Sequence, residues 1–219
     1  MLARLGVELI GELVAPSRCA ACEEHVGARV LFCVSCGLSV LRAGAQPSGQ
    51  HALFAYGGAV ATAIVRLKYA GRSDLAARFG DILGDTALPL AGTVDVVVPV
   101  PLHPRRLVER GFDQAALLAG PVARRLGIAH APRALLRTRE TPRQASLDRT
   151  ARSANVESAF RCGSSQHVAG RHVLLVDDVR TTGATLSSCA EALREAGARS
   201  VLSLVLASRD RDEKVHKTA

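Results

Sequence analysis

Two adjacent carboxylates, followed by a loop of small and hydroxylated residues, form the most informative run of the sequence. Asp177 and Asp178 come directly after Val173–Val176, four apolar residues that predict a buried strand of a parallel sheet. Residues 181–185, Thr-Thr-Gly-Ala-Thr, come next, and apolar residues at helical spacing then predict a helix that ends at Gly197. Backbone N–H groups at a helix N-terminus can hold a phosphate, and a carboxylate pair suits a ribose diol or a metal on that diol. The run therefore predicts a site for a 5-phosphoribosyl group.

Two other interpretations of this run have weaker support. An ordinary strand–loop–helix unit, whose acids only end a strand, would explain the pattern without any ligand. Four apolar residues followed by two aspartates are also typical of a nucleotide-binding strand in P-loop enzymes. Because the chain contains no Gly-Lys-Ser or Gly-Lys-Thr sequence, we exclude the P-loop class.

Four cysteines near the amino end form a second pattern with its own chemistry. Cys19 and Cys22 make one Cys-x-x-Cys pair, Cys33 and Cys36 make another, and ten residues separate the two pairs. This spacing can bring four thiolates to one tetrahedral point, which is what a structural zinc ion requires. Two disulfides are the alternative. Charged residues within the first fourteen positions disfavour them, because these charges argue against a secretory signal.

Composition and charge limit the class of protein. The chain has 219 residues, 48% of them hydrophobic, which is enough for one catalytic-sized domain beside a small module. A net charge of +8 suits a polyanionic ligand or nucleic acid, but 3% aromatic residues give little support to a protein that stacks single-stranded bases. No stretch approaches the ~20 apolar residues of a membrane span, so we expect a cytoplasmic protein.

The remaining elements must bring these groups together. The sequence pattern predicts helices over 1–14, 59–69, 73–83 and 113–126 and strands over 94–98 and 200–207. It also predicts a linker or loose hairpin over 37–52 and a mobile loop or short hairpin arm over 138–156. Pro121 is expected to kink or split the helix that contains it. Alternating strands and helices independently predict a parallel sheet with helices on its faces.

Motifs spread along the chain resemble the ComF family of bacterial proteins. In chain order they are the two cysteine pairs, Leu67-Lys68-Tyr69, residues 98–104, Arg110-Gly-Phe112 with Gln114, Arg139 and Thr141 with Gln144, Arg152 with Asn155-Val156, Phe160, and residues 173–185. The last of these matches the signature for 5-phosphoribosyl pyrophosphate (PRPP) over all of its positions. One departure is Asp113, where relatives commonly have Asn. Its charge would weaken binding if it faces pyrophosphate.

This resemblance implies a fold and a domain organisation. We expect a parallel sheet of about five strands flanked by helices, the type I phosphoribosyltransferase fold, preceded by a small zinc-ribbon-like module. Residues 1–50 would form an N-terminal helix and the zinc knuckle, residues 51–209 the phosphoribosyltransferase domain, and residues 210–219 a frayed tail.

The resemblance also implies roles for individual residues. Asp177 and Asp178 would bind the ribose hydroxyls and stabilise a cationic transition state. The backbone N–H groups and hydroxyls of the following loop would bind the 5-phosphate of PRPP: Arg180, Thr181, Thr182, Gly183, Ala184 and Thr185. Pyrophosphate would lie at Leu102, His103 and Arg105, with Mg²⁺ bridging it to the diol. A mobile loop would close over the site and contribute Arg139, Gln144 and Arg152.

Two functions are compatible with these features. The first is a Mg²⁺-dependent transferase that moves phosphoribosyl from PRPP to an acceptor that the sequence does not identify. The second is a competence or DNA-uptake factor that keeps PRPP binding with little or no catalysis. Its partners would be single-stranded DNA or competence proteins. The intact acid pair favours ligand binding in either case.

Overall fold

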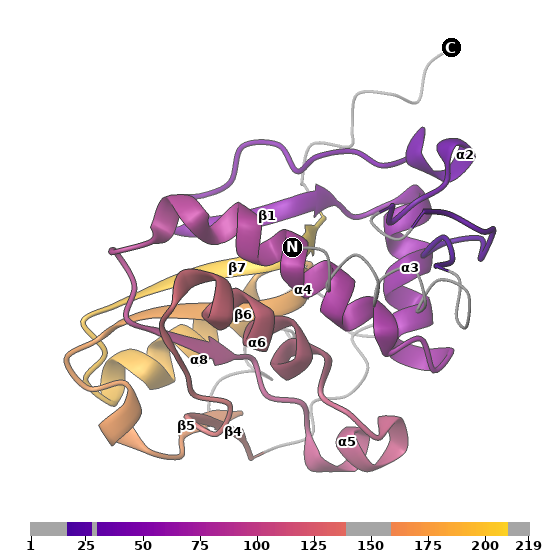
Figure 1. Ribbon diagram of the computed structural model, residues 1–219. Helices are drawn as coiled ribbons and strands as arrows, with labels where there is room; N and C mark the ends of the chain where they lie inside the picture. Colours follow the sequence, from indigo (N-terminus) through magenta and orange to yellow (C-terminus); the bar gives the residue numbers. More distant parts are fainter. Residues whose placement is uncertain (1–16, 28–29, 139–158, 210–219) are drawn as a thin grey trace, which may run out of the picture.

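The computed structural model describes residues 17–27, 30–138 and 159–209 of the chain (Figure 1). The described helices are α2 (Val34–Gly37), α3 (Gly58–Tyr69), α4 (Asp74–Ala87), α5 (Pro104–Arg110), α6 (Gln114–Leu126) and α8 (Ala184–Glu195), with short 3₁₀ turns at Leu88–Leu90 and Ser165–His167. The described strands are β1 (Gln50–Ala55), β2 (Val96–Pro99), β3 (Ala129–His130), β4 (Leu135–Arg137), β5 (Phe160–Cys162), β6 (His172–Arg180) and β7 (Ser200–Ser208). The predicted helix over 1–14, most of the predicted loop over 138–156 and the tail lie outside the described residues.

Five strands form one sheet in the order β1-β7-β6-β2-β3, and every pair in it is parallel. β6 is central, with β7 on one side and β2 on the other. The carboxyl ends of all five strands therefore lie at the same edge of the sheet. The expected parallel sheet flanked by helices is confirmed. β4 and β5 form a separate antiparallel pair.

Side chains alternate between the two faces of the sheet, and a different layer covers each face. Val97 and Leu174 point to one face and pack with α3, α4 and α6. Val98 and Leu175 point to the other face and pack with α8 and the β4–β5 pair. Figure 1 shows α4 and α6 in front of the sheet and α8 behind it. The three layers bury β6, so the end of this strand is a fixed position in the molecule.

The helices expected from apolar spacing are present, with small differences at their ends. α3 begins at Gly58, and α4 continues to Ala87, four residues beyond the predicted end. Ser73 occupies the N-cap position of α4, but its hydroxyl makes no capping hydrogen bond. Burial on the main core, rather than the cap, therefore fixes the start of α4.

Pro121 does not split α6, contrary to one of the two outcomes expected for it. The helix runs unbroken from Gln114 to Leu126 with the proline inside it. The proline ring packs against Gly80 of α4, where the absence of a side chain leaves room for it. Tertiary packing with α4 compensates for the hydrogen bond that proline cannot donate.

Two elements of the fold were not predicted as strand or helix. β1 begins at Gln50, inside the segment expected to be a linker. α5 begins at Pro104, and its side chains Leu107 and Val108 are exposed, so it has no buried apolar stripe by which spacing could reveal it. A proline at the first helical position starts such a short helix without losing a hydrogen bond.

The four-cysteine module, residues 17–40 as described, packs directly on the larger domain. Cys19 and Cys33 are buried together with Ala59 of α3, while Ala20 and Leu31 belong to the main core. The boundary at residue 50 stays a prediction, but the two parts share a packed contact. None of the helices that the structure describes combines the length and the apolar character needed to cross a membrane.

Candidate phosphoribosyl-binding site

The acid pair lies at the carboxyl end of the central strand β6. Asp178 is 8% exposed, and Asp177 is partly exposed. The carboxylate of Asp177 accepts a hydrogen bond from the backbone N–H of Asp178 at 2.8 Å. β2 ends at Pro99, which is paired with Val176, directly before the acids. The segments that follow β2 and β6 therefore meet at the acid pair, the usual place for a ligand in an open parallel sheet.

Lys68 neutralises one member of the pair. Its ammonium Nζ lies 2.8 Å from Oδ1 and 2.7 Å from Oδ2 of Asp178. Lys68 belongs to the last turn of α3, and its side chain is largely buried. Burial lowers the pKa of Lys68, but the charge of Asp178 outweighs it and leaves the pKa raised. Lys68 is therefore a charged ammonium beside the site.

Asp177 is in a different electrostatic position. Burial raises the pKa of Asp177 well above the usual range of an aspartate, and the negative charge of Asp178 raises it further. Lys68 lowers this pKa only in part. Asp177 can thus keep a proton close to neutral pH, and a positive charge arriving at the site would favour its release.

The loop after β6 encloses a small cavity of about 20 Å³. Its lining consists of Asp177 and residues 179–186. Gly183 adopts a φ of 84° at the start of α8, a conformation that residues with a side chain rarely adopt. The Ala184 N–H lies 3.4 Å from the Thr182 hydroxyl. Backbone N–H groups of the first helical turn have no acceptor within the helix, so this cavity, which we call the loop cavity, suits a phosphate.

The guanidinium of Arg180 makes contacts away from this loop. It donates hydrogen bonds to the hydroxyl of Ser208, at 2.6 Å from Nη2, and to the side-chain oxygens of Gln46 and Gln50. These contacts tie the end of β6 to β7 and to the segment containing β1. The role predicted for Arg180 thus involves its backbone, while its side chain stiffens the strand ends that carry the loop.

A larger cavity of about 150 Å³ is also lined by the acid pair, and we call it the basic cavity. Its lining residues are Lys68, Val100, Pro101, Leu102, Arg106, Arg110, Asp113, Gln114, Ala115, Arg137, Asp177, Asp178 and Thr185. It shares Asp177 and Thr185 with the loop cavity, so the two cavities adjoin. The four basic side chains favour an anionic ligand, and the three carboxylates favour a cation beside it.

One buried amide in the basic cavity has an unused donor. Gln114 is 3% exposed, and its Oε1 accepts a hydrogen bond from Nη1 of Arg110 at 2.9 Å. Nothing among the described residues accepts a hydrogen bond from its Nε2. A buried donor without an acceptor costs about 1–3 kcal/mol, so a ligand oxygen at this position would remove that cost.

Only one of the three residues predicted at pyrophosphate lines the basic cavity, and that residue is Leu102. His103 is the N-cap of α5, and its Nδ1 accepts a hydrogen bond from the Arg105 N–H at 3.3 Å. The Arg105 side chain is 70% exposed. Arg106 and Arg110, two other residues of α5, line the cavity instead. The short helix therefore brings Arg106 and Arg110 to the cavity, rather than the predicted His103 and Arg105.

Asp113 caps α6 and also contacts the segment after β2. Its Oδ1 accepts from the Ala116 N–H at 3.1 Å, and its Oδ2 accepts from the Leu102 N–H at 3.0 Å. Burial raises the pKa of Asp113, although the two hydrogen bonds oppose this effect. The carboxylate therefore occupies a backbone donor that an anionic ligand could otherwise use.

The four cysteines come together as their spacing predicts. Their sulfur atoms all lie within 4.8 Å of one another, and those of Cys22 and Cys33 are 3.6 Å apart. Burial raises the pKa of Cys19, but hydrogen bonds from backbone N–H groups, including that of Cys33 at 3.3 Å, outweigh it and lower the pKa to about 6. Metals bind the thiolate form, so the cluster could hold a metal ion.

Comparison with known proteins identifies the family. The DNA utilization protein YhgH of Salmonella typhi is 34% identical over 201 residues, which cover 84% of this chain and 86% of that protein. The chain belongs to the ComF family. A second ComF-family relative, the competence protein ComFC of Bacillus subtilis, is 29% identical over 165 residues that cover 71% of this chain and 62% of that protein.

The ComF-family chain contains a phosphoribosyltransferase-like domain. A sequence model of the phosphoribosyl transferase domain matches residues 113–219. Among solved structures, the glutamine PRPP amidotransferase of B. subtilis has a TM-score of 0.46 and 23% identity, over 64% of this chain and 30% of that one. The orotate phosphoribosyltransferase of Aeropyrum pernix has a TM-score of 0.40 and 20% identity, over 64% of this chain and 63% of that one.

Several residues of this ComF-family site were not predicted as site residues. Lys68, Arg110 and Gln114 were noted only within shared motifs, and Arg137 was not noted. Their signal in the sequence is weak, because each is a polar residue in or next to an apolar helix or strand. Three predicted site residues lie outside the described residues: Arg139, Gln144 and Arg152.

Proposed function

We propose that this ComF-family protein binds PRPP together with Mg²⁺ and transfers its phosphoribosyl group to an acceptor nucleophile. The observation that carries the proposal is the position of Asp177, which lines two adjoining cavities that each suit an anion, with Asp178 beside it in the basic cavity. PRPP has the same arrangement, with a diol between a 5-phosphate and a pyrophosphate. A site that binds a single phosphate group would not need two anion-binding cavities next to a pair of carboxylates.

In this proposal each part of the substrate has its own contacts. The loop cavity holds the 5-phosphate through backbone N–H groups of residues 180–185 and the threonine hydroxyls. Asp177 and Asp178 accept hydrogen bonds from the two ribose hydroxyls. The basic cavity holds pyrophosphate, and the Gln114 amide gains the acceptor that it lacks among the described residues. Arg106 and Arg110 supply positive charge there.

The acid pair would also assist the reaction. Positive charge develops on the ribose as pyrophosphate leaves, and two fixed carboxylates beside it would stabilise that charge. Mg²⁺ bound with the substrate would neutralise part of the pyrophosphate charge. Asp177 would lose its proton when the substrate and its cation arrive, so both carboxylates would be ionised in the complex.

The four-cysteine cluster is proposed to hold a structural zinc ion. Four thiol groups with no open coordination position are typical of structural rather than catalytic zinc. Reduced cysteines suit the cytoplasm, where we place the protein. The purified protein should contain about one zinc per chain. Cys22→Ser or Cys33→Ser should lose it, as elemental analysis would show. Protein that contains no zinc and no free thiols in this segment would contradict the proposal.

A second candidate function is a DNA-uptake factor that binds PRPP without catalysis. Two observations favour it: the relatives are named for competence and DNA utilization, and Arg105 of α5 is exposed near the basic cavity. The net charge of +8 should give some affinity for single-stranded DNA in any case. Affinity for DNA alone therefore does not decide between the two functions.

Calorimetry with PRPP, with and without Mg²⁺, tests the first proposal. We expect binding that Mg²⁺ strengthens, and pyrophosphate release when a suitable acceptor is added. Competition with single-stranded DNA at fixed salt then separates the two functions. If saturating PRPP with Mg²⁺ leaves DNA affinity unchanged, the loop cavity and the basic cavity bind PRPP and DNA binds elsewhere. Complete displacement of DNA by PRPP would instead identify a site for the DNA backbone and remove the main support for an enzyme.

A further inference from the structure

The last turn of α3 contacts both the acid pair and the four-cysteine module. On one side, Lys68 binds both carboxylate oxygens of Asp178. On the other side, Nη1 of Arg66, two residues earlier in the same turn, lies 2.6 Å from Oε1 of Glu23. Glu23 follows Cys22 directly in the sequence. The last turn of α3 therefore connects Glu23, the residue next to Cys22, to Asp178, which is expected to bind ribose.

A second arginine strengthens the contact at Glu23. Nη1 of Arg72, in the turn between α3 and α4, lies 3.3 Å from the same carboxylate oxygen, while its Nε binds Asp74 at 2.8 Å. The Arg72 side chain is 16% exposed. Hydrogen bonds and charge from Arg66, followed by those from Arg72, lower the pKa of Glu23. The Glu23 carboxylate thus pairs with one arginine in the last turn of α3 and with another in the turn that leads to α4.

The backbone of Glu23 depends on the fold of the cysteine module. Its φ is +68°, the only positive φ at a residue other than glycine among those described. Such a conformation persists only where surrounding contacts enforce it. The Glu23 N–H donates to the Cys19 carbonyl at 3.1 Å, and the Glu23 carbonyl accepts from Nη1 of Arg18 at 3.2 Å. If the module loosens, this backbone relaxes and its carboxylate leaves Arg66.

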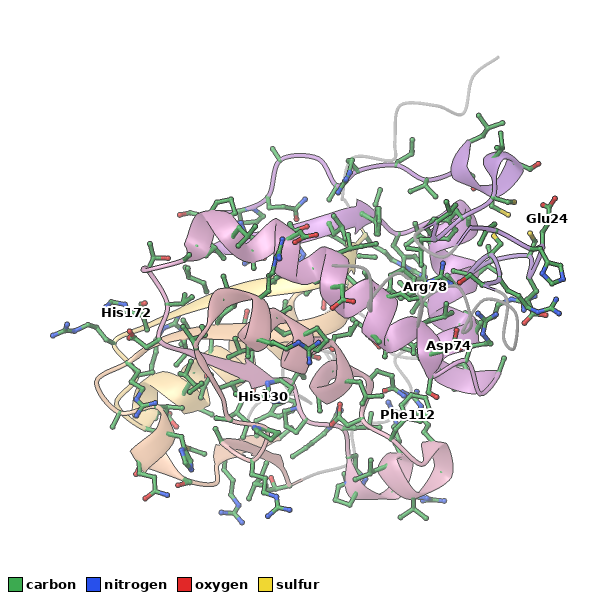
Figure 2. All side chains as sticks on the ribbon, in the orientation of Figure 1. Glu24, Asp74, Arg78, Phe112, His130 and His172 are labelled. Atoms are coloured by element: carbon green, nitrogen blue, oxygen red, sulfur yellow. The ribbon has the colours of Figure 1, made fainter. Side chains whose placement is uncertain are left out.

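Arg78 holds the same module against α4. Its Nη1 donates to the carbonyl oxygen of Arg18 at 2.9 Å, and its Nη2 donates to that of Val30. Figure 2 shows Asp74 and Arg78 between the cysteine module, marked by Glu24, and the segment after α5, marked by Phe112. The module is therefore fixed to both helices whose connection Glu23 contacts.

We propose that Glu23 is a positioning residue for the phosphoribosyl site. Through Arg66 and Arg72 it fixes the last turn of α3, and so holds Lys68 against Asp178 with its ammonium at the basic cavity. This inference rests on the proposed function, because its readout is PRPP affinity. It gives the cysteine module a task that neither proposed function assigns to it, which is to set the position of a cation in the ligand site.

A double-mutant cycle tests this coupling. Glu23→Gln keeps the size of the side chain and removes its charge, and Lys68→Met removes the cation at the site. We expect Glu23→Gln to weaken PRPP–Mg²⁺ binding about threefold when Lys68 is present, a usual size for coupling between sites. In the Lys68→Met background the same change should have no effect, because the side chain that Glu23 positions is absent.

Controls separate positioning from general damage. Asp85→Asn removes another carboxylate that pairs with an arginine, Arg125 at 2.6 Å, without touching α3, and should leave affinity unchanged. Metal content of Glu23→Gln should equal that of the wild type. If it falls, Arg66→Met tests the same contact from α3, without a change in the cysteine module, and should give the same loss.

The outcomes distinguish the coupling from the function on which it rests. Equal losses in both Lys68 backgrounds, or no loss in either Glu23→Gln or Arg66→Met, would overturn the coupling while PRPP binding stands. A wild-type protein that does not bind PRPP with Mg²⁺ would overturn the proposed function and this inference together.

Discussion

The two cavities beside the acid pair are built in different ways. The loop cavity is lined by Asp177 and eight consecutive residues, 179–186, and its binding groups are mostly backbone N–H groups and hydroxyls. The basic cavity is lined by residues from α3, β4 and β6, from α5, α6 and α8 with the cap of α6, and from the segment after β2. One cavity depends on the conformation of a short segment, and the other depends on how distant elements pack.

This difference determines which substitutions each cavity should tolerate. A cavity made of backbone tolerates changes of side chain but not changes of backbone conformation. A cavity made of charged side chains tolerates backbone adjustments but depends on the balance between its cations and carboxylates. The predictions below use PRPP–Mg²⁺ affinity to test this distinction.

Asp177 lines both cavities and Asp178 lines the basic cavity, so the loss of the acid pair should have the largest effect. Asp177→Asn combined with Asp178→Asn should weaken PRPP–Mg²⁺ binding by at least about a hundredfold, because two charge-assisted hydrogen bonds are lost together. Calorimetry measures the affinity, and elemental analysis should show unchanged zinc. Unchanged affinity in this variant would mean that the carboxylates do not contact the ligand.

Backbone strain should damage the loop cavity selectively. Gly183→Val forces a β-branched residue to a φ of 84° and should weaken binding about tenfold or more, because the loop must change conformation. Gly127→Val is the matched control, with a φ of 67° at the end of α6 and open space for a side chain. It should lower the melting temperature in the same way but keep the affinity. Equal affinity loss in both variants would contradict a backbone-built cavity.

Proton release should accompany binding and should depend on Asp177. Burial, and the charge of Asp178, raise the pKa of Asp177, so we expect the free protein to hold a proton there and the complex to favour the carboxylate. Affinity should therefore rise with pH through the titration of Asp177 and become constant above it. Calorimetry in two buffers with different ionisation enthalpies counts the protons. Asp177→Asn should release fewer, and an unchanged count would assign the release to the ligand alone.

A change in the charge balance of the basic cavity should have the smallest effect on PRPP–Mg²⁺ affinity, and it should raise this affinity rather than lower it. Asp113→Asn removes a carboxylate facing the expected pyrophosphate, keeps a good N-cap, and should strengthen PRPP binding about threefold. Asp95→Asn is the control, since Asp95 likewise accepts a backbone N–H, from His172 at 2.7 Å, at the opposite edge of the sheet. Weaker binding in Asp113→Asn would show that the carboxylate supports the site through Leu102.

The contrast between the cavities also explains what could be predicted from the sequence. Asp177, Asp178 and the loop up to Thr185 are contiguous, so a strand, a turn and a helix start specify their arrangement locally. Lys68 meets Asp178 across 110 residues, and no local pattern records that pairing. The parallel sheet was predictable for the same reason as the loop, because each strand and helix is visible in the sequence as its own apolar segment, and the alternation of strands with helices indicates a parallel sheet.

Errors in element assignment have similar physical causes. α5 was not predicted because Leu107 and Val108 face outward, which removes the apolar periodicity on which prediction depends. His103 and Arg105 were therefore assigned to the pyrophosphate, although the helix brings Arg106 and Arg110 to the cavity. Pro121 was expected to disrupt α6, because packing against another helix is not visible in local propensity.

Two glycines on α4 determine how closely α6 can approach. A Cβ at Gly80 would come within 2.7 Å of Cγ of Pro121, and a Cβ at Gly84 within 2.8 Å of Cβ of Arg125. The two glycines are one turn apart, so they form a smooth groove along α4. Gly80→Ala would push α6 outward, and with it Gln114 at the start of that helix. Pro121→Ala should then act as a second-site suppressor of Gly80→Ala, because removal of the ring restores the spacing on which the ligand cavity depends.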